Sequence, residues 1–440
     1  MTLDEFMQQA LRSARETRVL RIAPGAVAQV GEVYCGSFGG RRAVVVADTN
    51  TFAAAGKAAL DSLLKAGVAC EEPFVFTEPE LHADFDQVLR LDAMLSGTDA
   101  VPVAVGSGTI NDLVKLSAHH AGRRYMAVGT AASVDGYTSF GAAITYQDVK
   151  QTFDCPAPLA VLVDLDVVAG APEGMNASGY ADLMAKMTGG ADWILAEAAG
   201  EDPIDPVAWD LVQSRLREAL ADPAGVRKGD IQALEGLVAG LMMGGFAMQY
   251  TRTSRPASGA EHLFSHLWDM QHHTHNGTIP SHGFKVGVAT LAETRLYEQF
   301  YAMPIEDLQV DRLCREWPDW PEQEKRIRSL GCEPHITEKC VEESRLKHID
   351  RQRLAAQLER LRTGWPAVRE RLRRQLPPSG EVADMLRAVG APAEPEQIGI
   401  SRRRLRQTFY PAAYLRNRYT SLDFALRAGI LDRCLEGIFG

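Results

Sequence analysis

The 440-residue sequence has no run of eighteen apolar residues, which is about the length that a membrane-spanning helix needs. We therefore expect no transmembrane segment. The sequence also lacks a basic surplus, because 47 Lys and Arg face 57 Asp and Glu and the net charge is −10. Proteins that bind the nucleic-acid backbone need basic faces, so this balance argues against nucleic-acid binding.

Cysteines are few and widely spaced. The seven cysteines lie between Cys35 and Cys434 without the paired spacing of zinc ribbons. The N-terminus is acidic and amphipathic, unlike a signal peptide. An odd number of scattered thiols fits a reducing compartment, so we expect a cytoplasmic protein with free cysteines.

What the sequence does contain is ordinary globular composition, with 46% hydrophobic and 24% charged residues, at a length sufficient for two domains. Through the first 165 residues, short β-rich runs alternate with helical stretches near 53–66, 84–95 and up to about 121. The runs predicted as strands are Ala43–Asp48, Phe74–Thr77, Val101–Val105, Tyr125–Gly129 and Ala160–Asp164. This alternation predicts a Rossmann-like α/β domain with a parallel sheet, in which ligands bind at the carboxyl ends of the strands.

Strand signals disappear from about Asn176, and long helical periods follow. Pro172 and Gly174 interrupt the pattern just before this change. We expect residues 1–170 to form a nucleotide-binding α/β domain and residues 171–440 an all-α domain for metal and substrate, with the active site in the cleft between them. Residues 338–375 are crowded with Arg, Glu and Gln of alternating charge sign, which predicts a solvated helical face or a pair of helices.

Six of the eleven histidines fall between positions 262 and 282. His262 and His266 are four residues apart and share one face of a helix, and His282 follows shortly afterwards. Two imidazoles on a helix with a third nearby can hold a divalent metal ion and leave a position open for chemistry. Spacing alone equally allows a solvated helix face, and we expect His272, His273 and His275 to be loop residues.

A carboxylate usually completes such a metal site. Asp182 lies in the otherwise apolar helical stretch Gly179-Tyr-Ala-Asp-Leu-Met-Ala-Lys. A lone buried carboxylate there is costly without a partner, which makes Asp182 a candidate ligand.

Two glycine-rich or small-residue loops follow predicted strands. Gly106-Ser-Gly-Thr-Ile-Asn-Asp opens a helix, where backbone N–H groups can cradle a phosphate, although a tight turn explains it as well. Gly129-Thr-Ala-Ala-Ser-Val-Asp-Gly can wrap a cofactor and offer Asp135 to a substrate hydroxyl, or Asp135-Gly136 is only a turn. Asp48 ends the first predicted strand, where an acid either binds a ribose hydroxyl or caps the next helix.

These motifs occur together in a recognisable order. The two loops, the Asp182 segment, Ser258-Gly-Ala-Glu-His-Leu-Phe-Ser-His and His282-Gly-Phe-Lys-Val-Gly together resemble the glycerol-1-phosphate dehydrogenase family. That family belongs to the superfamily of dehydroquinate synthase, glycerol dehydrogenase and iron-containing alcohol dehydrogenases. The resemblance is clear over about residues 20–300 and weaker through the helical tail, where Ile398-Gly-Ile and Arg416-Asn-Arg-Tyr-Thr still fit.

The resemblance implies a role for each matching residue. Asp182, His262 and His282 match the ligands of one divalent ion, Zn²⁺ or Ni²⁺, and Asp182 also matches a substrate contact. Asp135 and His266 match substrate-contacting and catalytic positions. The matching NAD(H) or NADP(H) contacts are Gly106, Ser107, Gly108, Thr109, Ile110, Thr130, Ala131, Ala132, Ser133 and Ser139. One departure is that His282 follows His262 by twenty residues, and the loop between them carries three further histidines, His272, His273 and His275.

The implied activity is interconversion of dihydroxyacetone phosphate and sn-glycerol 1-phosphate by a metal-dependent NAD(P)-linked dehydrogenase, a reaction of phospholipid biosynthesis. One alternative is a dehydrogenase of another small polyol or polyol phosphate. The alternative from another class is a non-catalytic nucleotide- and metal-binding protein on the same fold. The expected partners are a small phosphorylated polyol or ketone and further copies of the chain, in a homodimer or larger homo-oligomer.

Overall fold

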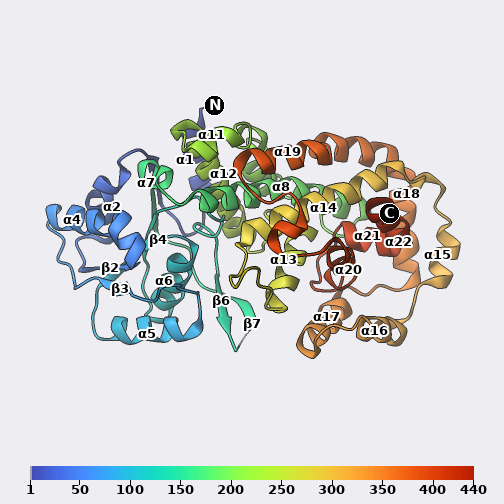
Figure 1. The fold of residues 1–440 in the computed structure, drawn as a ribbon, viewed down its shortest axis with the longest axis horizontal. Coiled ribbons are helices and arrows are strands. Elements are labelled where there is room, and N and C mark those ends of the chain that lie inside the picture. The colour runs from blue at the N-terminus through green and yellow to red at the C-terminus, as the bar shows by residue number, and fades with distance from the viewer. Residues whose placement is uncertain (1, 148) are drawn as a thin grey trace. The chain divides into compact units, whose positions relative to one another are not determined.

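The computed structural model describes residues 2–147 and 149–440, and its chain packs into two compact units. The first, which we call the α/β unit, comprises Met1–Leu183, Asp210–Ser254 and Ala388–Gly390. The second, the helical unit, comprises Met184–Trp209, Arg255–Arg387 and Ala391–Gly440 (Figure 1). The sequence predicts that the nucleotide binds to residues 1–170 and the metal and substrate to residues 171–440, and this division stays a prediction.

A six-stranded parallel sheet is the centre of the α/β unit, as the alternating pattern predicts. Its strands are β1 (Val19–Ala23), β2 (Ala43–Asp48), β3 (Phe74–Phe76), β4 (Val101–Gly106), β5 (Met126–Gly129) and β8 (Ala160–Asp164). Strands β4, β5 and β8 are buried along their whole length, which is typical of parallel strands covered on both faces.

The order of the strands fixes where a ligand can bind. The sheet runs β1-β8-β5-β4-β2-β3, so the chain leaves β2 toward β3 on one side and returns to β4 on the other. The reversal beside β2 is a topological switch point, and in such sheets ligands bind outside the carboxyl ends of the strands there. Asp48 is the last residue of β2 and Gly106 the last residue of β4, so both lie at those ends.

Helices cover the sheet. In the α/β unit they are α1 (Leu3–Ser13), α2 (Val30–Phe38), α3 (Thr49–Thr51), α4 (Lys57–Lys65), α5 (Phe85–Ser96), α6 (Gly108–His120), α7 (Leu165–Ala169), α10 (Leu216–Ala219), α11 (Pro223–Lys228) and α12 (Ile231–Thr251). A π-helical turn, Phe52–Gly56, joins α3 to α4. Tyr34 of α2 and Leu63 of α4 pack with Val45 and Val103 of the sheet in one apolar core.

Two strand elements were not expected from the sequence. Strand β1 lies at the edge of the sheet and exposes Arg21 in its middle. Strands β6 (Ala142–Tyr146) and β7 (Val149–Phe153) form a separate antiparallel hairpin. Neither has the continuous apolar run that marks the central strands.

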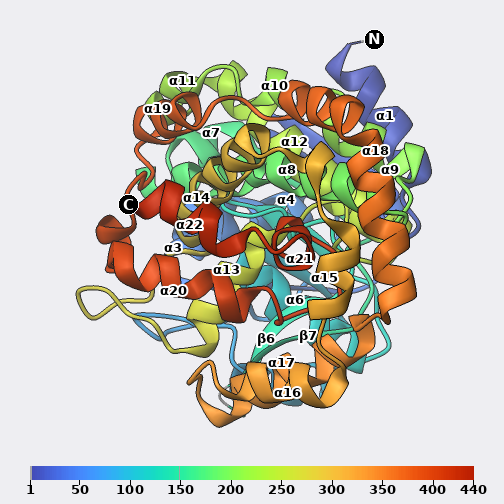
Figure 2. The same cartoon turned by 90° about the vertical axis from the view of Figure 1, so that its right-hand side faces the viewer.

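The helical unit contains α13 (Ala260–Met270), α14 (His282–Ala302), α15 (Val310–Glu316), α16 (Trp320–Arg328), α17 (Pro334–Lys347), α18 (Arg351–Gln375), α20 (Arg402–Ala412), α21 (Ser421–Arg427) and α22 (Leu431–Phe439). Helices α8 (Glu173–Ala199), α9 (Pro206–Gln213) and α19 (Ser379–Val389) belong partly to each unit. Helix α13 packs against α14 and α20, and α14 packs against α22 (Figure 2). The charged stretch 338–375 is a pair of helices, α17 and α18, as predicted.

Among the described residues, one helix, α12, is long and apolar enough to cross a membrane. Its most apolar window is 67% buried inside the protein. That burial is typical of a core helix, and α12 packs against α1, α7, α10 and α11 in the α/β unit.

Candidate metal centre and nucleotide loops

Helix α8 carries Asp182, the carboxylate predicted to bind metal. The helix is apolar on almost every side there, and the Asp182 side chain has no exposed surface. Its Oδ2 accepts a hydrogen bond from the backbone N–H of Asp135, at 3.1 Å. A buried carboxylate needs compensation of this kind, and a bound cation would add to it.

The two histidines come from neighbouring helices. His262 lies in the first turn of α13 and is buried, and His282 is the first residue of α14. Ser281 caps α14 by accepting the N–H of Phe284 at 3.4 Å, which fixes the start of the helix at His282. Ser265 Oγ also lies 3.3 Å from His282 Nδ1.

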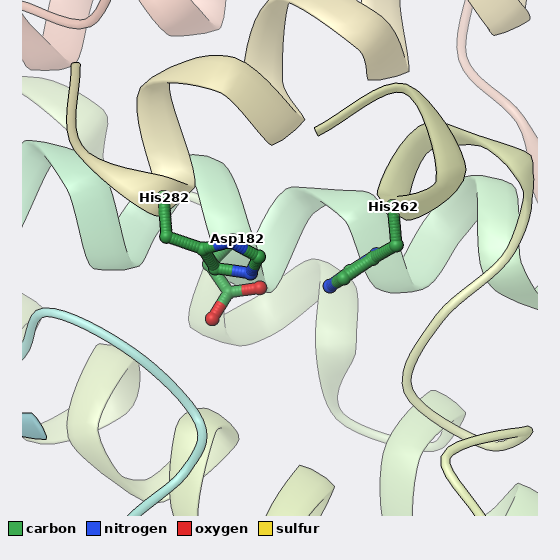
Figure 3. A group of neighbouring side chains, drawn as sticks. All are labelled: Asp182, His262 and His282. Atoms are coloured by element: carbon green, nitrogen blue, oxygen red, sulfur yellow. The ribbon is translucent and has the colours of Figure 1, made fainter. Parts of the chain in front are cut away.

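Each of three residues, Asp182, His262 and His282, offers one potential ligand atom, and these three atoms lie within 4.8 Å of one another (Figure 3). Two imidazoles and one carboxylate are a donor set that suits Zn²⁺ and other first-row divalent ions, and three protein ligands leave an open position. These residues therefore fit a divalent metal ion. The His266 ring lies 6.2 Å from those of His262 and His282, centroid to centroid, so it borders the group without being part of it.

Glu261, which was not predicted from the sequence as a site residue, contacts the His262 ring. Its Oε1 lies 2.6 Å from His262 Nδ1 and accepts the N–H of Gly259, also at 2.6 Å. Burial alone would raise the pKa of Glu261, but its hydrogen bonds, that with His262 foremost, lower the pKa below its ordinary value. An acidic residue directly before a ligand histidine is the sequence signal that would have identified it.

Two more buried carboxylates lie beside Glu261. Asp192 Oδ2 accepts the N–H of Ala260 at 2.8 Å, and Glu293 Oε2 accepts the N–H of Glu261 at 3.0 Å. Burial, together with the charges of Asp192 and Glu261, raises the pKa of Glu293 well above its ordinary value. Burial also raises the pKa of Asp192, so two of the three acids in this cluster bind a proton more tightly than exposed carboxylates do.

The glycine loop after β4 has the geometry of a phosphate cradle. Gly106 ends β4, Ser107 precedes α6, and Gly108, Thr109 and Ile110 form its first turn, whose N–H groups have no partner within the helix. A Cβ on Gly106 would come within 2.6 Å of the Ile110 side chain, so only glycine allows this close strand-to-helix turn.

The second predicted cofactor loop lies beside the first. Gly106 and Gly129 are register partners in β4 and β5, and Thr130, Ala131, Ala132 and Ser133 continue from Gly129 as buried residues. The N–H of Thr130 donates to the Gly106 carbonyl at 3.2 Å. Neighbouring parallel strands thus bring both loops to one edge of the sheet.

Helix α8 and helix α6 hold the second loop in place. Asn176 Oδ1 accepts the N–H of Ala132 at 3.0 Å, and Gly179 packs directly on the Ala132 carbonyl oxygen. The buried Lys115 donates to the carbonyls of Gly136 and Gly141, both at 2.9 Å. These positioning residues were missed because their partners are backbone atoms far away in the sequence.

Ser139 is buried, and its hydroxyl donates to the Gly136 carbonyl at 3.0 Å. Asp48 caps α3, because its Oδ1 accepts the N–H of Thr51 at 2.8 Å while Thr51 Oγ1 accepts the N–H of Asp48 at 3.0 Å. The capping alternative for Asp48 is therefore confirmed, and the ribose contact stays a prediction.

The three extra histidines lie in a loop, as expected. His273 is buried, with Nε2 2.6 Å from the Ile398 carbonyl and Nδ1 2.9 Å from Arg404. Since the guanidinium can only donate, Nε2 carries the proton, and His273 stabilises the loop.

A parallel sheet with glycine loops at its switch point and a His₂Asp group on long helices define a metal-dependent, nucleotide-linked dehydrogenase class. Residues 21–172 match the family described as iron-containing alcohol dehydrogenase. Glycerol dehydrogenase from Schizosaccharomyces pombe shares the fold at 16% identity, with a TM-score of 0.59, over 96% of this chain and 90% of that one.

Relatives with higher sequence identity identify the family within this class. The chain is 35% identical over 267 residues to glycerol-1-phosphate dehydrogenase (NAD(P)+) of Halalkalibacterium halodurans, covering 60% of this chain and 67% of the relative. It is 31% identical over 388 residues to the protein of that name from Geobacillus stearothermophilus, covering 87% and 86%. The chain belongs to the glycerol-1-phosphate dehydrogenase family.

Proposed function

We propose that this protein interconverts dihydroxyacetone phosphate and sn-glycerol 1-phosphate, with NAD(H) or NADP(H) as the hydride carrier. The observation that carries the proposal is the Asp182, His262 and His282 group in a chain of this family. The α/β part, residues 1–170, would bind the nucleotide, and the helical part, residues 171–440, would hold metal and substrate.

The loops at the carboxyl edge of the sheet would bind the cofactor. The N–H groups at the start of α6, from Ser107 to Ile110, suit its pyrophosphate, because a helix start favours negative charge. Thr130 to Ser133 and Ser139 would line the nicotinamide side, and Asp48 would contact the adenosine ribose.

Asp182, His262 and His282 would hold a Zn²⁺ or Ni²⁺ ion. When bound, a divalent ion supplies Lewis-acid polarisation of the C2 oxygen. The His266 imidazole would exchange a proton with that oxygen, and a positioned imidazole contributes about 10²–10⁴-fold in such a transfer. Asp135 would fix the terminal hydroxyl of the substrate, with Asp182 at the edge of the same site.

The remaining expectations concern the setting of the enzyme. The cysteines are all free thiols, which suits the proposed cytoplasmic location. We propose a homodimer or larger homo-oligomer and a role for the product in phospholipid synthesis.

The test combines metal analysis with substrate comparison. Purified protein should contain one divalent ion per chain, lose NADH oxidation after chelation and regain it with Zn²⁺ or Ni²⁺. Two charge-assisted contacts to phosphate, each worth about 1.5–3 kcal/mol, should make dihydroxyacetone phosphate better than dihydroxyacetone by about two to four orders of magnitude in kcat/KM.

Both glycerol phosphate enantiomers and free glycerol serve as comparisons in the reverse direction. Equal or better turnover of a non-phosphorylated polyol would replace the proposal with a polyol dehydrogenase. Metal and nucleotide binding without turnover of any of these compounds would indicate a binding protein.

A further inference from the structure

The start of α13 is buried and has no side-chain cap of its own, because Gly259 occupies the capping position. Three carboxylates replace the cap. The successive N–H groups of residues 259, 260 and 261 donate to Glu261, Asp192 and Glu293, at 2.6, 2.8 and 3.0 Å. The first turn of α13, which carries His262, is therefore held by three buried acidic side chains.

No side chain larger than hydrogen fits at position 259. A Cβ there would lie 2.8 Å from Asp192 Oδ2 and from Glu261 Oε2, and 3.0 Å from Gly189 Cα. Gly259 thus lets helices α8 and α13 approach closely enough for Asp192 and Glu261 to accept the backbone N–H groups at the start of α13. The same approach sets Thr188 Oγ1 3.0 Å from Glu261 Oε2, so both carboxylate oxygens of Glu261 have a polar neighbour.

Glu261 also determines which nitrogen of His262 carries a proton. Oε1 of Glu261 already accepts the N–H of Gly259, so this oxygen acts as an acceptor and its 2.6 Å contact places the proton on Nδ1 of His262. Nε2 then keeps its lone pair, and the ring directs a nitrogen toward Asp182 (Figure 3). A carboxylate behind a ligand imidazole both fixes its orientation and makes it a stronger base.

We propose that Glu261 is a positioning residue for the metal centre, which locks His262 in the Nδ1–H form and presents Nε2 to the ion. The proposal rests on the proposed function through its metal ion. Glu261→Gln keeps the volume of the side chain and removes its charge. The metal dissociation constant, measured by competition with a chromophoric chelator, should rise about 10- to 100-fold in the variant.

The matched control is Glu343→Gln, another buried glutamate of the helical unit, whose Oε2 accepts the N–H of Asn417 at 2.9 Å. It contacts no proposed ligand, so its metal dissociation constant should stay within about twofold of the wild-type value. Thermal unfolding of both metal-free variants then separates loss of metal binding from general loss of structure.

A second readout needs no metal and does not use the Glu261→Gln variant. In the metal-free wild-type protein with ¹⁵N-labelled histidine, the His262 resonances, assigned by comparison with His262→Gln, should show protonated Nδ1 and unprotonated Nε2. The Nε2–H form in the wild type, or unchanged metal affinity in Glu261→Gln, would overturn the proposal. If the wild type takes up no divalent ion, the proposed function fails and this inference fails with it. Tight wild-type binding with an unaffected variant overturns only the inference.

Discussion

The backbone N–H of Asp135 donates a hydrogen bond to Oδ2 of Asp182 at 3.1 Å. Asp135 ends the second cofactor loop, and Asp182 is a candidate metal ligand, so one bond joins the two parts of the proposed site. Upstream on the same helix, Asn176 and Gly179 contact Ala132 of that loop. The position of the loop therefore depends on how closely α8 approaches it.

Gly179→Ala tests this dependence. A methyl group at position 179 would overlap the carbonyl oxygen of Ala132, and both atoms belong to rigid backbone. The loop must move, so we expect KM for NAD(H) to rise at least about tenfold and the free energy of unfolding to fall by about 1–3 kcal/mol. NADH titrations in steady-state kinetics and urea unfolding measure the two effects.

The control is Gly36→Ala on α2. Position 36 is exposed, and a Cβ there meets nothing within 4 Å among the described residues. Alanine favours the helix over glycine by up to about 1 kcal/mol, so this variant should be as stable as wild type or more so. A normal KM in a folded Gly179→Ala protein would contradict the role given to α8.

Asp48→Asn separates the two roles that the sequence leaves open. Asparagine caps a helix about as well as aspartate, so the bond from Thr51 should survive and stability should change by less than about 0.5 kcal/mol. If Asp48 also faces the ribose, its charge repels the extra phosphate of NADPH. The ratio of kcat/KM for NADPH to that for NADH should then rise at least about tenfold on removing the charge. An unchanged ratio would leave Asp48 as a cap only.

His266→Gln and His262→Gln should fail in different ways. His266 borders the metal group without belonging to it, so its variant should retain the ion and lose about 10²–10⁴-fold in kcat. The His262 variant should lose the ion itself. Metal content after dialysis, measured beside kcat, distinguishes them. Loss of metal from the His266 variant alone would reverse the two assignments.

The extent to which the fold could be predicted from the sequence depended on the burial of each strand and helix. Strands β2, β4 and β8 are continuous apolar runs because helices cover both faces, and their predicted positions are confirmed. Strand β1 carries Arg21, whose exposure at the sheet edge breaks the pattern. Helix α12 reads as apolar in sequence, but nothing local shows that it packs with the α/β unit.

The site shows the same limit. The spacing of His262, His266 and His282 and the isolated charge of Asp182 are local signals, and the structure brings three of these four residues within ligand distance. The function of Glu261 depends on Asp192 and Glu293, which lie 69 residues before it and 32 residues after it in the sequence. Only the packed helices bring those acids to the start of α13.

The raised pKa of Glu293 predicts a pH dependence of stability. Burial and the nearby charges of Asp192 and Glu261 raise the pKa of Glu293 well above 4.5 in the folded protein. Well below pH 4.5 the group is protonated whether the chain is folded or not. As the pH rises above 4.5, the unfolded chain releases this proton and the folded chain retains it, so the stability from this group falls until the folded pKa is passed.

Glu293→Gln removes that dependence, because glutamine imitates the neutral acid at every pH. Relative to the wild-type value, the free energy of unfolding of this variant should therefore rise by up to about 1.4 kcal/mol per pH unit above pH 4.5, until the folded pKa of Glu293 is passed. Urea unfolding of both metal-free proteins at several pH values measures the difference. A pH-independent difference would mean that Glu293 has an ordinary pKa in the folded protein.

Thr290→Val is the control on the same helix, one turn earlier. Thr290 Oγ1 is buried with no hydrogen-bond partner in the part of the chain that the structure describes. Replacing this hydroxyl with a methyl group of similar size should stabilise the protein by about 1–3 kcal/mol, the cost of an unsatisfied buried group. Because no proton is gained or lost, that gain should be the same at pH 5 and pH 7, whereas the Glu293→Gln difference grows.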